Sequence, residues 1–353
     1  ELFLDQNELT AEIERNFIKT LDEYHSQPET WNNALDDQIR RWYLGAKTVF
    51  PKRPYFSPSS ANSCPLELYV KAKRAKRDIE ARQPHQARWQ RIGTAIGDII
   101  QRDLLDYEEQ ETKEGRTPKF RFLRTHRGEP AFEDFAKYNK HVKMADDNGE
   151  IVEFYLYGAP DGIMEYVTDD GEVIRVGLEV KSKQTTPART SEYSMREADE
   201  DHRVQVVAYS HMYEVDYYII LYVNAAKKTW HYDTLEDYEK SPDVRAFAYH
   251  ITDVHRYELL SKLANLQSRI NNNDRPDIDP NRWTFNNYKT ATVAQLNAKD
   301  IEKLRAHRKL AEKATNVRDF VKRNLIEAID DIIERWEDSR KRPVNPDEDK
   351  ARK

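Results

Sequence analysis

The chain has 353 residues, of which 38% are hydrophobic and 34% charged, and its formal net charge at pH 7 is −6. This length favours one catalytic-size domain with a helical extension. The polarity excludes a membrane protein, whereas 12 Phe, 20 Tyr and 6 Trp exclude a disordered chain. The single cysteine, Cys64, excludes an internal disulfide and an all-cysteine metal site within one chain. No basic-then-apolar leader opens the sequence, so we expect no secretion signal and a cytoplasmic protein.

Positive charge is concentrated in two segments. Residues 69–92 include eight basic and two acidic side chains, and residues 113–127 include six basic and one acidic. Either segment alone is typical of a solvated helix face. Two such segments in a net-acidic chain favour a positively lined channel.

The hydrophobic periodicity predicts the elements in chain order. Helical spacing covers about 9–24, 31–49, 65–77 and 86–107. Alternating apolar and polar residues predict strands between about 119 and 183, with turns at 146–149 and 169–171. A helix over 195–214 and a strand pair at 217–223 and 228–232 follow, and the chain is mostly helical from Asp243 onward. This order predicts an α/β core with an all-helical annex.

The same pattern sets the expected domain boundaries. Residues 1–56 form a helical N-terminal extension, 57–240 the core, 241–340 a helical C-terminal region and 341–353 a flexible tail.

The residues that can carry chemistry lie in the strand-rich segment. Asp161 stands in a Gly-Ala-Pro-Asp-Gly string, and Glu179 and Lys181 stand in a later strand, on one face because side chains alternate along a strand. A hairpin that returns at 169–171 can bring Asp161 beside Glu179. Two convergent carboxylates suit Mg²⁺ or Mn²⁺, and a lysine beside such an ion can orient or deprotonate an attacking water. Metal-assisted phosphodiester hydrolysis uses all three groups.

Each piece of this pattern is common by itself. A Glu-x-Lys triplet occurs on many half-exposed strands, and Asp-Gly is an ordinary turn. A third element makes the combination specific, because Gln205 and Tyr209 lie four residues apart on one face of the next predicted helix.

In this combination the chain resembles the PD-(D/E)XK nuclease superfamily, and within it the RecB-like and Cas4-like exonuclease branch. Ser57 to Pro65 and the glycine Gly93 also resemble the opening of that branch. The resemblance covers roughly residues 57–228. It implies a restriction-endonuclease-like core, that is, a central mixed β-sheet flanked by helices, with helical N- and C-terminal elaborations.

The resemblance also assigns roles to individual residues. Asp161, Glu179 and the carbonyl group of Val180 would bind one or two Mg²⁺ or Mn²⁺ ions, and Lys181 would be the catalytic lysine. Gln205 and Tyr209 would contact DNA and support that lysine. Lys183, on the same strand face as Lys181, is a further candidate for contact with the DNA backbone, or else an ordinary surface lysine.

Two departures from the family pattern stand out. Gly97 occupies the position where the family often has a metal-binding histidine. Asp98, which we favour, or Gln101 could substitute, or two carboxylates and waters suffice. Gly93 and Gly97 fall on one helix face, which is typical of close approach by another backbone or by DNA, and equally of simple helix packing.

The second departure concerns the iron–sulfur cluster of some relatives. Cys64 stands where their first cysteine would be, but the cysteines that would complete the cluster are absent, so we expect no cluster. Trp283, Phe285 and Tyr288 would replace it with apolar packing, and Cys64 would be a buried structural thiol.

The sequence thus predicts a metal-dependent deoxyribonuclease, most simply an exonuclease that processes DNA ends in recombination, repair or replication in a bacterium or its phage. The alternatives are a flap- or junction-specific endonuclease, a catalytically silent DNA-binding module, and a subunit that recruits a recombination or replication protein through its C-terminal helices. No membrane partner is expected.

Overall fold

A computed structural model of the protein describes residues 4–29, 31–46, 51, 53–79, 83–226 and 229–341. The α-helices are α1 (Glu8–His25), α2 (Asn33–Gly45), α3 (Pro65–Ala72), α4 (Pro84–Lys113), α5 (Glu200–Tyr213), α6 (Leu235–Glu239), α7 (Asp253–Asn271), α8 (Lys289–Ala294), α9 (Ala298–Lys313) and α10 (Asp319–Lys341). The strands are β1 (Phe120–Phe122), β2 (Tyr138–Ala145), β3 (Ile151–Gly158), β4 (Gly162–Val167), β5 (Val173–Lys183), β6 (Tyr217–Asn224) and β7 (Val244–His250). Short 3-10 helices are η1 (Pro58–Ser60), η2 (Glu133–Phe135), η3 (Pro187–Thr190) and η4 (Pro280–Arg282). Within these ranges, no helix combines the length and apolar character needed to cross a bilayer.

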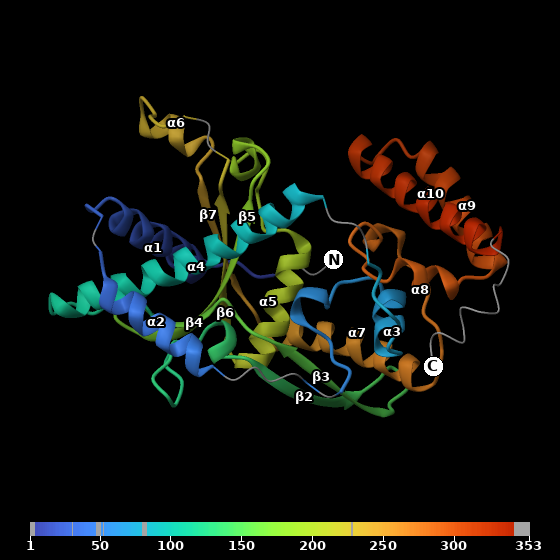
Figure 1. Ribbon diagram of the computed structural model, residues 1–353, viewed down its shortest axis with the longest axis horizontal. Coiled ribbons are helices and arrows are strands. Elements are labelled where there is room, and N and C mark those ends of the chain that lie inside the picture. The colour runs from blue at the N-terminus through green and yellow to red at the C-terminus, as the bar shows by residue number, and fades with distance from the viewer. Residues whose placement is uncertain are drawn as a thin grey trace. The chain divides into compact units, whose positions relative to one another are not determined.

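A central five-stranded sheet has the order β1-β4-β5-β6-β7 (Figure 1). The β5–β6 pair is parallel and the other three pairs are antiparallel, so the sheet is mixed. The parallel pair needs a crossover, and α5 supplies it between the two strands. A separate two-stranded antiparallel sheet is made of β2 and β3. The predicted α/β class, with a central mixed sheet flanked by helices, is confirmed.

The two faces of the central sheet are covered by different helices. On one face, apolar residues of α1, α2 and α4 pack against alternate residues of β4, β5 and β6, among them the fully buried Leu178 and Ile219. On the other face lies α5, which contacts both β5 and β6 (Figure 1). The intervening residues Glu179 and Lys181 of β5 therefore face α5, because successive side chains of a strand point to opposite faces.

A glycine allows one close contact on the α5 face. A Cβ atom at Gly177 would lie 2.1 Å from the ring of Tyr218 on the neighbouring strand β6. The fully buried Tyr218 ring in turn stacks on the ring of Tyr209 from α5, with centroids 6.4 Å apart. The small residue in β5 thus makes room for the aromatic packing that anchors α5.

The predicted elements before residue 224 are found with shifts at their ends, and the mostly helical character predicted from Asp243 onward is found in α7 to α10. Two segments between residues 228 and 250 differ from the prediction. The strand predicted at 228–232 is absent from its described part, residues 229–232. The partner of β6 is instead β7, in a segment predicted to be helical. β7 buries Phe247 and Tyr249, while the small Ala248 faces the α1 side of the sheet.

The chain divides into two compact units. One unit comprises residues 1–62 and 82–263, and the other 63–81 and 264–353. The N-terminal helices belong to the first unit, since Ile13 and Phe17 of α1 and Leu35 of α2 are part of its hydrophobic core. Apart from Lys341, the predicted tail lies outside the described residues.

The second unit contains Cys64. Its thiol is buried and accepts a hydrogen bond from the backbone N–H of Asp279 at 3.3 Å, and burial raises its pKa. Trp283 is buried as expected, and its Nε1 donates to Asp331. The expectation that Phe285 joins this packing is wrong, because its side chain is 87% exposed.

Candidate active site

The antiparallel pairing of β4 and β5 places Asp161 next to the Glu-x-Lys segment. Gly162 pairs with Leu178, so Asp161 lies at the end of β4 beside Glu179 and Val180. The backbone N–H of Val180 donates to Asp161 Oδ2 at 2.7 Å. The hairpin therefore brings the two parts of the sequence motif together, as their spacing predicted.

Lys181 is held between two side chains of this face. Its Nζ lies 2.7 Å from Glu179 Oε1 and donates to Gln205 Oε1 at 2.9 Å. Gln205 Nε2 donates to the same Glu179 oxygen at 2.7 Å. The amide of Gln205 thus bridges the lysine and the carboxylate, and this closed set of contacts fixes the position of the ammonium group.

Tyr209, one helical turn after Gln205, supports the segment that leads into Asp161. Its hydroxyl donates to the carbonyl oxygen of Ala159 at 2.6 Å. A Cβ atom at Gly158 would lie 3.2 Å from the Tyr209 ring and 3.0 Å from Pro58, so this segment is packed closely on both sides. Gln205 and Tyr209 are each 6% exposed and make internal contacts, whereas direct contact with DNA stays a prediction.

The site concentrates buried carboxyl groups. Burial, and secondarily the charge of Glu179, raises the pKa of Asp161 to about 8. Burial likewise raises the pKa of Glu179, although Lys181 opposes this shift. Glu179 is 3% exposed, and its Oε2 has no hydrogen-bond partner among the described residues. A buried carboxylate oxygen without a partner is costly in free energy, and such groups gather where a ligand supplies the missing interaction.

The donor set fits a hard divalent cation. Asp161 and Glu179 offer carboxylate oxygens, and Glu179 Oε2 is available to accept a new partner. No group of three His, Cys, Asp or Glu side chains within the described ranges is arranged to hold a metal ion. The protein side chains would therefore supply few ligands, and waters or substrate would fill the other coordination positions. Mg²⁺ is typically bound in this way in proteins. Coordination by the Val180 carbonyl stays a prediction.

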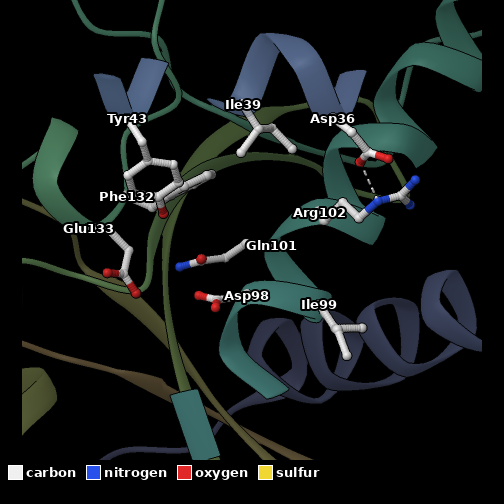
Figure 2. A pocket seen from close by; sticks show the side chains of 9 residues that line it. All are labelled: Asp36, Ile39, Tyr43, Asp98, Ile99, Gln101, Arg102, Phe132 and Glu133. Atoms are coloured by element: carbon white, nitrogen blue, oxygen red, sulfur yellow. Dashed lines mark hydrogen bonds and ion pairs between the residues drawn. The ribbon is translucent and has the colours of Figure 1, made fainter. Parts of the chain in front are cut away.

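The two residues considered in place of the missing histidine differ in their contact with the site. Gln101 reaches the site, since its buried Nε2 donates to the carbonyl oxygen of Asp161 at 2.8 Å. Asp98, the favoured candidate, lines a cavity beside Gln101 together with Glu133 (Figure 2). A Cβ atom at Gly97 would have no neighbour within 4 Å, so among the described residues no other element packs against this position.

Glu133 is an acidic residue of this region that the sequence analysis missed. Burial, followed by the charges of Asp161, Asp98 and Asp134, raises its pKa to about 7. Its backbone N–H donates to Pro160 at 2.8 Å, which fixes η2 next to Asp161. Glu133 also has a positive φ of 49°, which is uncommon for a residue other than glycine. An isolated acidic pair between two strands carries no spacing signal by which it could have been found.

Lys183 belongs to a different set of contacts. Its Nζ lies 2.8 Å from Asp199 Oδ2 and 5.0 Å from the centre of the Tyr222 ring. The Tyr222 hydroxyl is also 2.7 Å from His202 Nδ1, and burial, with the charge of Lys181 next, lowers the pKa of His202 to about 4. Contact between Lys183 and DNA stays a prediction. Nearby, a Cβ atom at Gly93 would lie 3.0 Å from Ser182 Oγ, so this glycine serves the packing of α4 on β5.

Comparison with known proteins gives similarity in structure alone. No family model and no curated protein matches the sequence. Among solved structures, the chain is similar to SSO0001, with 9% identity, a TM-score of 0.36, and coverage of 75% of this chain and 97% of that one. It is also similar to LHK-Exo in complex with dAMP, with 11% identity, a TM-score of 0.33, and coverage of 63% and 90%. A second structure of LHK-Exo, an alkaline exonuclease from Laribacter hongkongensis, gives 10% identity, a TM-score of 0.32, and coverage of 67% and 96%. Likenesses this weak do not establish a function for this chain.

Proposed function

We propose that this protein is a divalent-cation-dependent DNA nuclease of the PD-(D/E)XK type, and that it acts as an exonuclease. The observation that carries the proposal is the position of Lys181, whose ammonium group is held by Glu179 and Gln205 beside the buried carboxyl of Asp161. Each of these residues belongs to one sequence motif, and in the folded chain they lie together.

The arrangement supports hydrolysis of a phosphodiester. Asp161 and Glu179 would hold a Mg²⁺ or Mn²⁺ ion, which as a Lewis acid stabilises negative charge on the phosphate. Lys181 has three N–H donors and uses two of them within the described residues, so one remains for a water or a phosphate oxygen. Its side chain is 22% exposed, which leaves the ammonium group accessible to substrate.

In the reaction, the oxygen of a water molecule forms a bond to phosphorus and gives up a proton to solvent. The bond from phosphorus to the leaving sugar oxygen breaks, and that oxygen takes up a proton from solvent. Lys181 orients the water, and its charge stabilises the developing negative charge at phosphorus. Gln205 keeps the lysine in place, and Tyr209 keeps the segment before Asp161 in place. Because DNA is a polyanion, its binding should weaken as salt rises and depend little on sequence.

The preference for strand ends, and a role in recombination, repair or replication, come from the resemblance of the motif to exonucleases. The competing proposal is a flap- or junction-specific endonuclease with the same chemistry. A catalytically silent DNA-binding or recruitment subunit is the third possibility, and the complete set of Asp161, Glu179 and Lys181 argues against it.

The test is digestion of linear and covalently closed circular DNA with Mg²⁺ or Mn²⁺, using the native chain and Lys181→Ala. We expect degradation of linear DNA only, and a loss of at least about 10³-fold in rate for Lys181→Ala, which corresponds to about 4 kcal/mol of transition-state stabilisation. A matched control is Lys140→Ala. Lys140 is also a strand lysine in an ion pair with 22% of its side chain exposed, but its partner is the exposed Glu214.

Each outcome has a distinct meaning. Cutting of closed circles supports the endonuclease. Equal inactivity of native and Lys181→Ala protein with either metal contradicts the proposed nuclease, and retained DNA binding would then favour the silent module. Equal losses in Lys181→Ala and Lys140→Ala would show that the site is not specific to Lys181.

A further inference from the structure

A cavity of about 500 Å³ lies beside the catalytic carboxylates, in the compact unit that contains them. Its volume is in the range of small-molecule binding sites, which are concave, mostly apolar and carry a few polar groups. The lining residues come from α2, α4 and the segment around η2 (Figure 2).

The cavity has apolar walls and one polar edge. Ile39, Tyr43, Ile99 and Phe132 supply the apolar surface. The Tyr43 ring packs against Phe135 at a centroid distance of 4.8 Å, yet Tyr43 remains 39% exposed. It therefore retains surface for a further contact.

The polar edge is formed by Asp98, Gln101 and Glu133, whose side chains converge from α4 and η2 (Figure 2). Arg102 is already engaged, since its Nε donates to Asp36 Oδ1 at 2.8 Å. The other polar groups are two carboxyl groups and the amide of Gln101, whose side chain also hydrogen-bonds Glu133. The carboxyl oxygens can accept further hydrogen bonds from N–H donors.

This edge is directly connected to the catalytic centre. Gln101 lines the cavity and donates from Nε2 to the carbonyl oxygen of Asp161 at 2.8 Å. Glu133 lines it as well, and its backbone N–H donates to the carbonyl of Pro160, the residue before Asp161. A group bound in the cavity would therefore contact residues that are themselves hydrogen-bonded to the backbone at or next to Asp161, the proposed metal ligand.

The lining discriminates among the parts of a nucleic acid. Asp36, Asp98 and Glu133 give the cavity an acidic excess over Arg102, which opposes entry of a phosphate. The aromatic and aliphatic walls disfavour a hydrated ion, whereas a nucleobase is planar and uncharged and carries N–H donors. Stacking on aromatic side chains binds bases with little sequence preference.

We propose that this cavity receives the nucleobase at the end of a DNA strand, next to the phosphodiester to be cleaved. The inference rests on the proposed nuclease function and adds to it a binding site for the terminal base. It gives the enzyme a physical reason to prefer ends, because a terminal base can leave the stack more easily than an internal one.

Two isoleucines of α4 provide a matched pair of variants. Ile99 lines the cavity and is 55% exposed, so Ile99→Trp can fill the space without disturbing a buried core. Ile92 is 43% exposed on the same helix and is not among the lining residues, so Ile92→Trp makes the same chemical change away from the cavity. Tyr43→Ala is a second cavity variant that removes aromatic surface instead of adding it.

The experiment measures DNA affinity in the full-length Lys181→Ala protein with Mg²⁺, by anisotropy of a dye in the loop of a hairpin duplex that has one open end. The open end carries either ordinary terminal nucleotides or tetrahydrofuran abasic ones. We expect the abasic end to bind about tenfold more weakly, in line with the loss of one stacked base. Adding Ile99→Trp should weaken binding of the ordinary end to the level of the abasic end. Tyr43→Ala should reduce the difference in affinity between the two ends, and Ile92→Trp should preserve it.

Equal affinity for the two ends in the Lys181→Ala protein overturns the inference, as does an undiminished difference in both Ile99→Trp and Tyr43→Ala. If native protein degrades linear DNA but the ends are not distinguished, the cavity assignment fails and the nuclease stands. If native protein neither cleaves nor binds DNA, both fail. A loss of Mg²⁺ affinity in Ile99→Trp, with no change in discrimination between the ends, would make the cavity a cation site and also overturn the inference.

Discussion

The two faces of β5 have opposite physical character although they are built from alternating residues of one strand. Leu178 is fully buried in an apolar core beneath α1, α2 and α4. Glu179, the next residue, is almost as completely buried, but it lies beneath α5 among polar groups and keeps one oxygen without a partner in the described structure. Burial on the first face stabilises the fold, whereas burial on the second raises carboxyl pKa values and prepares a site for a ligand.

Substitution of Glu179 should have the largest effect on activity and little effect on stability. Glu179→Gln removes one carboxylate of the proposed metal site and weakens the contact that holds Lys181, so we expect DNA cleavage to fall by at least about 10³-fold, or about 4 kcal/mol. The thermal midpoint should not fall, because the substitution also removes a buried charge. Cleavage assays and calorimetry on one preparation test both parts, and activity within tenfold of native would contradict the assignment.

Leu178→Ala is the counterpart on the other face. Loss of a fully buried leucine side chain leaves a cavity and should lower the free energy of unfolding by about 2–5 kcal/mol. The fraction that remains folded should cleave DNA at close to the native rate, since Leu178 faces away from the site. Urea denaturation gives the stability. A loss of activity as severe as that of Glu179→Gln, in protein shown to be folded, would mean that the two faces are not independent.

The contrast between the faces was predictable from sequence because it depends on short-range geometry. Period-two alternation placed Glu179 and Lys181 together, and four-residue helical spacing did the same for Gln205 and Tyr209. Asp161 needed only one hairpin. Each of these relations is fixed by local backbone geometry, so the sequence motif was enough to predict which of these side chains lie together.

The features that the sequence did not predict depend on long-range packing. β7 lies in a segment that was predicted to be mostly helical. Ala246 and Ala248 have weak strand propensity, yet Ala248 lies in the core cluster on the α1 face of the sheet. Glu133 reaches the site through a backbone hydrogen bond to Pro160, which no spacing rule signals. Asp98, chosen for its nearness to Gly97 in sequence, lines the cavity beside the proposed catalytic centre.

The buried carboxyls should also make stability depend on pH. In the unfolded chain Asp161 loses its proton near pH 4, whereas in the folded protein its pKa is about 8. Between these values the folded state holds the extra proton, so the free energy of unfolding falls as pH rises from about 4 to 8, by up to about 1.4 kcal/mol per pH unit for one group, and then levels off.

Asp161→Asn should flatten this part of the profile, as measured by thermal midpoints in EDTA from pH 5 to 9. Excess Mg²⁺ should raise the midpoint of the native protein more at pH 8 than at pH 5, because the cation favours the ionised carboxylates. Parallel profiles for native protein and Asp161→Asn would show that Asp161 does not take up the proton.

The smallest effect is expected at Lys183, which shares a strand face with Lys181 but differs from it in environment. Its partner Asp199 has 54% of its side chain exposed, and ion pairs of that kind contribute about 0–1 kcal/mol to stability. Lys183→Ala should therefore leave the free energy of unfolding within about 1 kcal/mol of native, and a double-mutant cycle with Asp199→Ala measures the pair directly.

If Lys183 also contacts a phosphate, its removal should leave the cleavage rate at saturating DNA unchanged and reduce the slope of log Kd against log salt by about one. A drop in that saturating rate as large as that of Lys181→Ala would instead place Lys183 in the reaction itself. The division between a catalytic lysine and a binding lysine on one strand would then be wrong.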